Sequence, residues 1–123
     1  MATILVIDDD QIIVDLLKMV VEDAGHAAII ANGPDRIPNS LSPDLIITDL
    51  VPLKAYHVDA ARQWIAELRG RFPSVPIVVV TAHGEALQEA DHLSADDVLE
   101  KPFDVDRLGM TLARLLPKRL LTS

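Results

Sequence analysis

The sequence predicts an α/β domain in which a five-stranded parallel sheet is covered by helices on both faces. Short runs rich in β-branched residues alternate strictly with stretches whose apolar residues recur at helical spacing. The short runs are apolar at consecutive positions, which is typical of strands buried on both faces of a parallel sheet. Right-handed crossovers then give a doubly wound sandwich. Without a repeat or linker in the sequence, residues 1–123 are predicted to form one domain.

The first elements follow this alternation. "ILVI" (residues 4–7) is the first predicted strand, and the apolar residues of 11–24 recur with the period of a helix that Gly25 ends. "HAAIIA" (26–31) predicts a weak second strand. "NGPD" predicts a turn, and this turn opens a short helix that reaches about Leu41.

The middle of the chain continues the pattern with stronger signals. "PDLIITDL" (43–50) is a continuous apolar strand, and a longer helix is predicted from about 58 to 71, before "FPSVP". "IVVV" (77–80) is the most β-branched run in the chain. A short helix over about 85–92 follows it.

The last strand and helix complete the predicted sandwich. "DVLE" (97–100) is a weak strand, and the final helix begins after "KPFD" and runs to about Leu116. Asp104 is the expected N-cap of this helix, as Asp10 is of the first, because a short acceptor side chain satisfies free backbone N–H groups there. Trp64 is interpreted as core or rim packing, and "DD" at 96–97 as a solvated turn.

Composition limits the function classes that fit. Hydrophobic residues make up 50% of the 123, aromatics only 3%, and the mean hydropathy is +0.27, so the core is expected to be aliphatic. A net charge of −8 argues against binding nucleic acid or an anionic membrane, since both need a basic face. The sequence has no cysteine, which excludes disulfides and thiol chemistry. With no apolar run of spanning length, we expect a soluble, cytoplasmic protein.

Polar residues follow the predicted strands at the point where each strand ends. Asp8 and Asp9 follow the first strand, Asp49 ends the third, Thr81 follows the fourth and Lys101 follows the fifth. Parallel strands bring their carboxyl ends to one edge of a sheet, where ligands of doubly wound folds bind. Three carboxylates, a hydroxyl and an ammonium are therefore expected at a single site.

This set of groups suits phosphoryl transfer with a divalent cation. Three clustered carboxylates repel one another, and a hard cation with oxygen ligands, Mg²⁺ or Mn²⁺, offsets that repulsion. Lys101 and Thr81 would then hold phosphoryl oxygens, as a point charge and a hydroxyl donor. Such a site acts mainly by positioning and by neutralising charge.

The chain resembles the receiver domains of bacterial two-component response regulators over essentially its whole length. Four stretches carry the resemblance, in the order and near the spacing of the family: "ILVIDDDQ", "PDLIITDL", "VPIVVVTA" and "SADDVLEKPF". The resemblance implies a flavodoxin-like fold with strand order 2-1-3-4-5. It also implies a regulatory domain rather than an enzyme, with no chemistry beyond its own phosphorylation and dephosphorylation.

The resemblance assigns a role to each site residue. Asp49 would accept a phosphoryl group from the phosphohistidine of a sensor histidine kinase or phosphotransfer protein. Asp8 and Asp9 would hold Mg²⁺ together with Asp49 and the backbone carbonyl of Val51. The Thr and Lys that follow the fourth and fifth strands would contact the phosphoryl group, and this Thr would carry the switch to an unknown downstream partner or output domain.

The chain departs from the family pattern at three places. Pro52 comes one residue earlier after the phosphoacceptor than the family's usual methionine-proline pair, and no glycine follows in this loop. Val98 stands where the family usually has an aromatic residue that moves on activation. Ser94 stands where glycine is common.

Two other functions fit parts of the sequence. A haloacid-dehalogenase-type phosphohydrolase would use Asp8 as nucleophile and Asp10 as acid, but it would leave Asp49 without a role. A degenerate receiver would bind a partner without being phosphorylated, as the unusual loop and Val98 would suggest. Whether Asp49 becomes phosphorylated distinguishes the phosphorylated receiver from these two alternatives.

Overall fold

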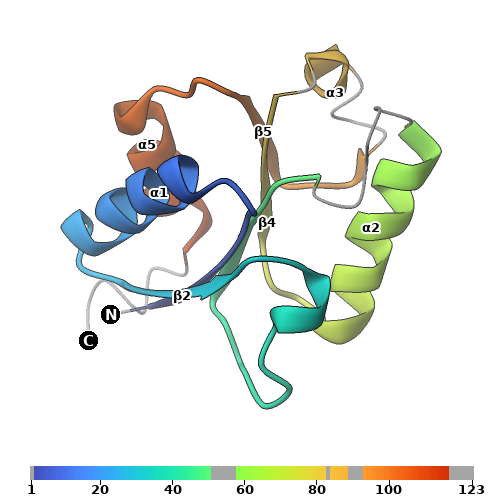
Figure 1. The fold of residues 1–123 in the computed structure, drawn as a ribbon, viewed down its shortest axis with the longest axis horizontal. Helices are drawn as coiled ribbons and strands as arrows, with labels where there is room; N and C mark the ends of the chain where they lie inside the picture. The colour runs from blue at the N-terminus through green and yellow to red at the C-terminus, as the bar shows by residue number, and fades with distance from the viewer. Residues whose placement is uncertain (1, 51–57, 83, 89–92, 117–123) are drawn as a thin grey trace.

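The computed structural model describes residues 2–50, 58–82, 84–88 and 93–116 and has the predicted alternation of strands and helices (Figure 1). The elements in chain order are β1 (Thr3–Ile7), α1 (Gln11–Asp23), β2 (Ala27–Ala31), the 3₁₀ helix η1 (Pro34–Arg36), β3 (Leu45–Thr48), α2 (Val58–Arg71), β4 (Ile77–Thr81), α3 (Glu85–Gln88), β5 (Asp97–Glu100) and α5 (Val105–Leu115). Among the described helices, none is long and apolar enough to cross a membrane.

All strand pairs of the five-stranded sheet are parallel, in the order β2-β1-β3-β4-β5, which confirms the predicted fold class and strand order. The register aligns the ends of neighbouring strands. Ile7, the last residue of β1, pairs with Thr48, the last residue of β3. Thr81 and Glu100, which end β4 and β5, pair in the same way. The residues that directly follow these strands therefore meet at one edge.

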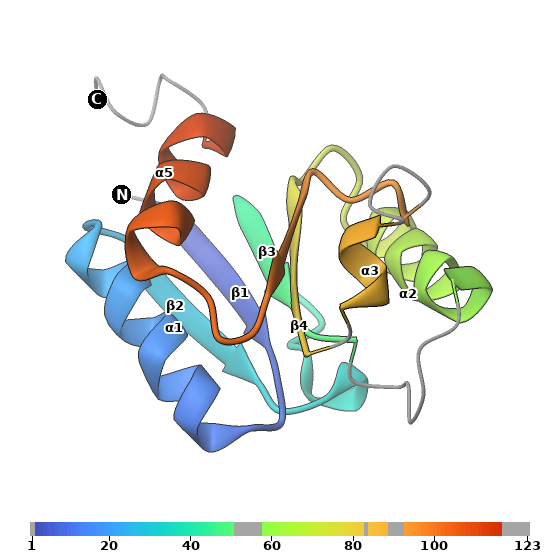
Figure 2. The same cartoon turned by 90° about the horizontal axis from the view of Figure 1, so that it is seen from above.

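Helices cover both faces of the sheet, with α1 and α5 side by side on one face and α2 and α3 on the other (Figures 1 and 2). Alternate residues of β1 face the two layers, as the two-residue period of a strand requires. Leu5 and Ile7 pack with buried residues of α2 and α3. Ile4 and Val6 pack with buried residues of α1 and α5. Buried strands of this kind explain the continuous apolar runs in the sequence.

The predicted helix caps are confirmed. The Asp10 side chain accepts a hydrogen bond from the backbone N–H of Ile12, and Asp104 accepts from the first turn of α5. Gly25 follows α1 with φ +88°, a left-handed conformation that favours glycine.

The helix predicted to reach about Leu41 is wrong, because only the 3₁₀ turn η1 forms and it ends at Arg36. Pro38 accounts for the difference. A proline disfavours helical backbone in the residue before it, and Ile37 is indeed extended, with φ −74° and ψ 124°.

The interpretation of residues 96–97 as a solvated turn is also wrong. Asp96 Oδ2 accepts from the backbone N–H of Ile77 at 2.8 Å and pairs with Arg69 Nη2 at 3.1 Å. Asp97, the first residue of β5, accepts from the Thr111 hydroxyl at 2.8 Å and pairs with two arginines of α5. These carboxylates tie helices to the sheet.

Candidate functional site

Three carboxylates converge where β1 and β3 end. Asp8 and Asp9 follow β1, and Asp49 directly follows β3. Each offers an oxygen within 4.8 Å of the others, in a group whose members are buried, exposed and intermediate respectively. The parallel register produces this convergence, because it aligns the last residues of β1 and β3.

Asp8 lies at the bottom of the site, with a side chain that is 0% exposed. Its Oδ1 accepts from the backbone N–H of Asp10 at 2.9 Å. Its Oδ2 is buried and accepts no aligned hydrogen bond from the described residues, although the Lys101 ammonium lies 3.0 Å away as an ion-pair partner. Burial, which disfavours the charged form, raises the pKa of Asp8 above its ordinary value.

Lys101 bridges two of the three carboxylates. Its Nζ lies 3.0 Å from Asp8 Oδ2 and 3.2 Å from Asp49 Oδ2, and its side chain is 13% exposed. Burial acts to lower the pKa of this lysine, but the two carboxylates outweigh it and raise the pKa above the ordinary value. The charged form is therefore favoured at this position, which follows β5 directly.

The backbone and the carboxylate of Asp49 are both held. Its N–H donates to the Ile7 carbonyl at 2.8 Å across the β1–β3 boundary. Its Oδ1 accepts from the backbone N–H of Leu50 at 2.8 Å, and its Oδ2 accepts from Lys101 Nζ. The Asp49 side chain is 17% exposed, so it is more accessible from solution than Asp8.

Thr81 ends β4 and is buried. Its carbonyl accepts from the backbone N–H of Lys101 at 2.8 Å, which fixes the start of the segment after β5 to the end of β4. Thr81 and Lys101 therefore lie at the same edge of the sheet as the carboxylates. The expected ligand carbonyl of Val51, like the unusual position of Pro52, lies outside the described residues.

Two residues that the sequence did not single out for the site form a hydrogen-bonded chain that ends at the backbone carbonyl of Asp49. The Thr48 hydroxyl donates to the Asp49 carbonyl at 2.7 Å, and the Trp64 indole N–H donates to the Thr48 hydroxyl at 3.1 Å. Both side chains are buried. Trp64 lies in the core, one of the two placements that the sequence left open. Its polar contact depends on how α2 packs against β3, which the sequence does not display.

The donor set fits a hard divalent cation. Three carboxylates face one another, and one of the buried oxygens accepts no aligned hydrogen bond within the described part of the chain. Carboxylate oxygens are the ligands that Mg²⁺ and Mn²⁺ prefer. When bound, such a cation would supply positive charge that neutralises the carboxylates.

Comparisons with known proteins identify the family. The family model described as "Response regulator receiver domain" matches residues 4–113. The nitrogen assimilation regulatory protein NtrX of Azorhizobium caulinodans is 31% identical over 118 residues, which cover 92% of this chain and 26% of NtrX. The transcriptional regulatory protein PhoP of Escherichia coli is 30% identical over 118 residues, which cover 92% of this chain and 51% of PhoP. The chain thus spans about a quarter to a half of the length of these relatives.

Solved structures agree with this identification. NtrX from Brucella abortus in complex with ADP superimposes with a TM-score of 0.79 at 31% identity, covering 98% of this chain and 27% of that one. A response regulator receiver domain protein from Clostridium thermocellum has a TM-score of 0.75 at 25% identity and is covered completely, as is this chain. With the family model matching most of the sequence and the strand-end residues gathered at one edge, this chain belongs to the response regulator receiver domain family.

Proposed function

We propose that this domain receives a phosphoryl group on Asp49 in a Mg²⁺-dependent reaction and passes the signal on by a change of conformation. The observation that carries the proposal is the setting of the Asp49 carboxylate. It is partly exposed, and one of its oxygens lies within 4.8 Å of an oxygen of each of the two other carboxylates. The Lys101 ammonium lies 3.2 Å from Asp49 Oδ2. The Asp49 carboxylate is thus a partly exposed nucleophile that lies beside the other two proposed cation ligands and beside a fixed positive charge.

The step transfers the phosphoryl group from a phosphohistidine to an oxygen of Asp49. The P–N bond breaks, a P–O bond forms, and the electron pair of the broken bond stays on the imidazole nitrogen, which then takes up a proton. Asp8, Asp9, Asp49 and the Val51 carbonyl would hold Mg²⁺ or Mn²⁺. Lys101 would contact the phosphoryl oxygens as a point charge, and this contact would offset the charge that the transfer adds.

The geometry favours Asp49 over Asp8 as the nucleophile. A phosphohydrolase of the haloacid dehalogenase type would attack with Asp8, yet that side chain is 0% exposed and packed against Lys101. A degenerate receiver would not need a reactive carboxylate. The convergence of all three carboxylates with Lys101 supports a reactive site instead.

A labelling experiment with acetyl phosphate tests the proposal. The wild type should take up phosphoryl label when Mg²⁺ is present, and EDTA or the Asp49→Asn substitution should abolish the uptake. Asp44→Asn is a matched control, because Asp44 precedes β3 at the opposite edge of the sheet and bonds the backbone of Thr3. Labelling of Asp49→Asn at the wild-type rate would contradict the proposal.

We further propose that the phosphohistidine donor docks on α1 and α5. Ile12 and Met19 on α1 and Val105 and Met110 on α5 are exposed, at 78%, 47%, 40% and 70%. Ile12 and Val105 lie in the first turns of their helices, directly after the segments that supply Asp8–Asp10 and Lys101. A donor protein that brings its histidine to Asp49 would therefore contact Ile12 and Val105 first.

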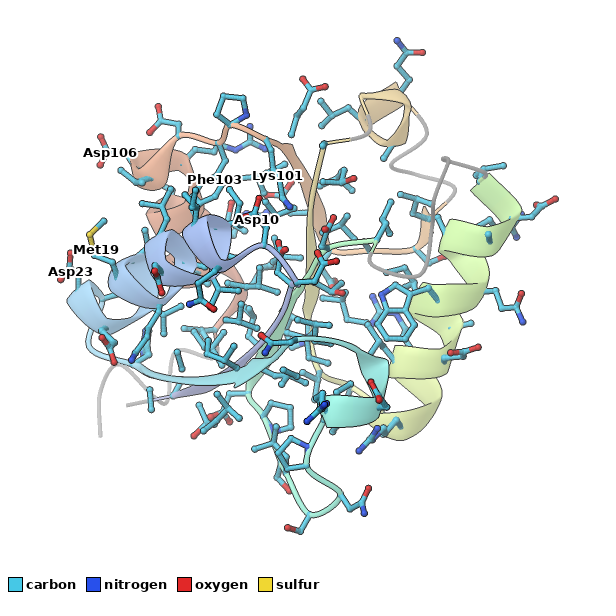
Figure 3. The ribbon with its side chains drawn as sticks, in the orientation of Figure 1. Asp10, Met19, Asp23, Lys101, Phe103 and Asp106 are labelled. Atoms are coloured by element: carbon cyan, nitrogen blue, oxygen red, sulfur yellow. The ribbon has the colours of Figure 1, made fainter. Side chains whose placement is uncertain are left out.

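The rim of this surface indicates the charge of the donor. Asp23 and Asp106 flank the groove between α1 and α5 in which Met19 and Met110 lie, and Figure 3 shows Met19, Asp23 and Asp106 on the outer side of the two helices. An apolar groove with acidic flanks suits an amphipathic helix that carries basic residues beside its apolar face.

A substitution at Ile12 separates docking from chemistry. We expect Ile12→Ser to slow phosphoryl transfer roughly tenfold when the donor is a histidine kinase that phosphorylates the wild type. Truncating an interface anchor costs more than about 1 kcal/mol of binding free energy. Labelling by acetyl phosphate should not change, since that donor needs no docking surface. Leu87→Ser, at another exposed apolar side chain on α3, is the control. Equal effects of both variants on transfer would contradict docking on α1 and α5.

The conformational response is expected to be incomplete. In the receiver family the hydroxyl residue after the fourth strand moves with an aromatic on the fifth, and here that position is Val98. Val98 is buried against the α2 and α3 layer, and it has no aromatic face to bury or expose. A downstream partner would then complete the shift by binding the phosphorylated form more tightly.

A further inference from the structure

A chain of two buried hydrogen bonds runs from the helix layer to the backbone of the phosphoacceptor. The Trp64 indole N–H donates to the Thr48 hydroxyl at 3.1 Å, and the Thr48 hydroxyl donates to the Asp49 carbonyl at 2.7 Å. Thr48 is 0% exposed and Trp64 6%. The two bonds therefore form where water competes little for either partner.

The order of donors fixes where the Thr48 proton points. An indole N–H only donates, whereas a hydroxyl donates one hydrogen bond and accepts others. Because Trp64 donates to the Thr48 oxygen, the hydroxyl proton is free to point at the Asp49 carbonyl, at a distance typical of a strong O–H···O bond. Trp64 thus orients the hydroxyl, and the hydroxyl holds the peptide group between Asp49 and Leu50.

That same peptide group holds the reactive carboxylate. Its N–H, on Leu50, donates to Asp49 Oδ1 at 2.8 Å. A peptide group is planar, so fixing the direction of its carbonyl also fixes the direction of its N–H. The Thr48 hydroxyl at one end of the plane therefore determines where the N–H at the other end meets the Asp49 carboxylate.

We propose that Thr48 and Trp64 are positioning residues that hold the Asp49 carboxylate in its reactive orientation through the Asp49–Leu50 peptide group. The inference rests on the proposed phosphorylation of Asp49 and adds the means by which the core sets its geometry. Losing the Thr48 hydroxyl lets this peptide group rotate and leaves the indole N–H without its acceptor. The Asp49 carboxylate then samples orientations in which neither oxygen faces the donor.

Conservative variants test the positioning role. Thr48→Val removes the hydroxyl and keeps the shape of the side chain, and Thr48→Ser keeps the hydroxyl and loses a methyl group. Trp64→Phe keeps an aromatic side chain, smaller than indole, and removes the N–H. Thr111→Val is a matched control, since it removes another buried threonine hydroxyl, one that donates to Asp97 rather than to the site. Each variant is labelled with acetyl phosphate at saturating Mg²⁺, and its maximal rate and KM are separated.

Thr48→Val should lower the maximal rate roughly five- to tenfold with little change in KM, as the loss of one orienting hydrogen bond would. Thr48→Ser should recover most of the rate, Thr111→Val should keep it, and Trp64→Phe should fall between the wild type and Thr48→Val. Trp64→Phe alone decides the test if Thr48→Val does not fold. Wild-type rates in all folded variants would overturn the inference, whereas failure to label the wild type would overturn the proposed function as well.

The single tryptophan adds a signal that a merely structural role would not give. With ¹⁵N-labelled tryptophan, the indole N–H resonance of Trp64 should shift when beryllofluoride and Mg²⁺ bind at Asp49 in the wild type and in Thr48→Ser. In Thr48→Val the added shift should be much smaller, because the hydroxyl that links the indole to Asp49 is gone. Equal shifts in all three proteins would overturn the inference.

Discussion

Replacing Lys101 by methionine should destabilise the metal-free domain at neutral pH. The Lys101 ammonium lies 3.0 Å from Asp8 Oδ2 and 3.2 Å from Asp49 Oδ2. Methionine has a comparable length and no charge, so the variant keeps most of the packing and removes the cation. Asp8 is 0% exposed, so its carboxylate would lose the ammonium that offsets its charge and would gain no water in its place.

The size of the effect follows from the burial of the three groups. Removing one partner of a fully buried ion pair costs about 3–5 kcal/mol. Here Lys101 is 13% and Asp49 17% exposed, so water screens part of the loss and a destabilisation of about 2–3 kcal/mol is expected. For a chain of 123 residues this corresponds to a fall in Tm of about 8–12 °C.

The pH dependence has a defined sign at each end. The pKa of Asp8 is raised above 3.8 in the folded protein, mainly by burial. Above its folded pKa the charged carboxylate therefore lowers the free energy of unfolding, and this loss disappears as the pH falls through the folded pKa. The pKa of Lys101 is raised above 10.5, because two carboxylates outweigh burial, so its contribution is present below 10.5 and is lost as the pH rises through the folded pKa. The difference between wild type and variant should therefore be largest between these two limits.

Urea unfolding of both proteins across this pH range, in EDTA, measures the difference between their free energies of unfolding. Excess Mg²⁺ should make this difference smaller at neutral pH, since the cation would replace the charge of the ammonium. Lys18→Met removes an exposed lysine of α1 and should change the free energy of unfolding by less than about 1 kcal/mol. A Lys101→Met variant as stable as the wild type at neutral pH, or equally destabilised at all pH values, would refute the reasoning.

Three further predictions follow from the site and from the segments beside it. Mg²⁺ at 100 times its Kd should add about 2.7 kcal/mol to the free energy of unfolding of the wild type and so raise its Tm. The Tm of Asp9→Asn or Asp49→Asn should rise less, and equal gains would remove these carboxylates from the metal site. Beryllofluoride should shift NMR resonances between β4 and α5 only partway. Hydrogen bonds of Thr81 supply about 1.5–3 kcal/mol, whereas a complete switch needs a free-energy difference of roughly 5.5 kcal/mol between the two conformations. Full displacement without a partner would show that Val98 does not limit the switch. Ser94→Gly should raise the free energy of unfolding by about 1 kcal/mol in a urea titration, because Ser94 has φ +61°; a loss would contradict this.

The sequence predicts the fold and the edge that holds the site because both depend on short-range patterns. Strands that are apolar on both faces must lie in a covered parallel sheet, and its register then gathers the residues that follow Ile7, Thr48 and Glu100. The helix α2 has the predicted bounds because its apolar period and its breaker both lie in the sequence. The shorter turn before Pro38 could have been predicted from the effect of proline on Ile37.

The sequence does not predict how side chains meet across the core. Lys101 pairs with both Asp8 and Asp49, and this depends on side-chain directions that strand positions do not specify. The Trp64–Thr48 hydrogen bond joins residues 16 positions apart, and it depends on how α2 lies on β3. Nothing in their spacing along the chain marks them as polar partners.

The site of phosphorylation tests the central claim most directly. After incubation with acetyl phosphate and Mg²⁺, borohydride reduction converts an acyl phosphate on an aspartate into a stable product that peptide mapping can place. We predict that the product lies at Asp49. A product at Asp8 would support the phosphohydrolase instead, and a folded protein with no product at either residue would show that the domain acts without being phosphorylated.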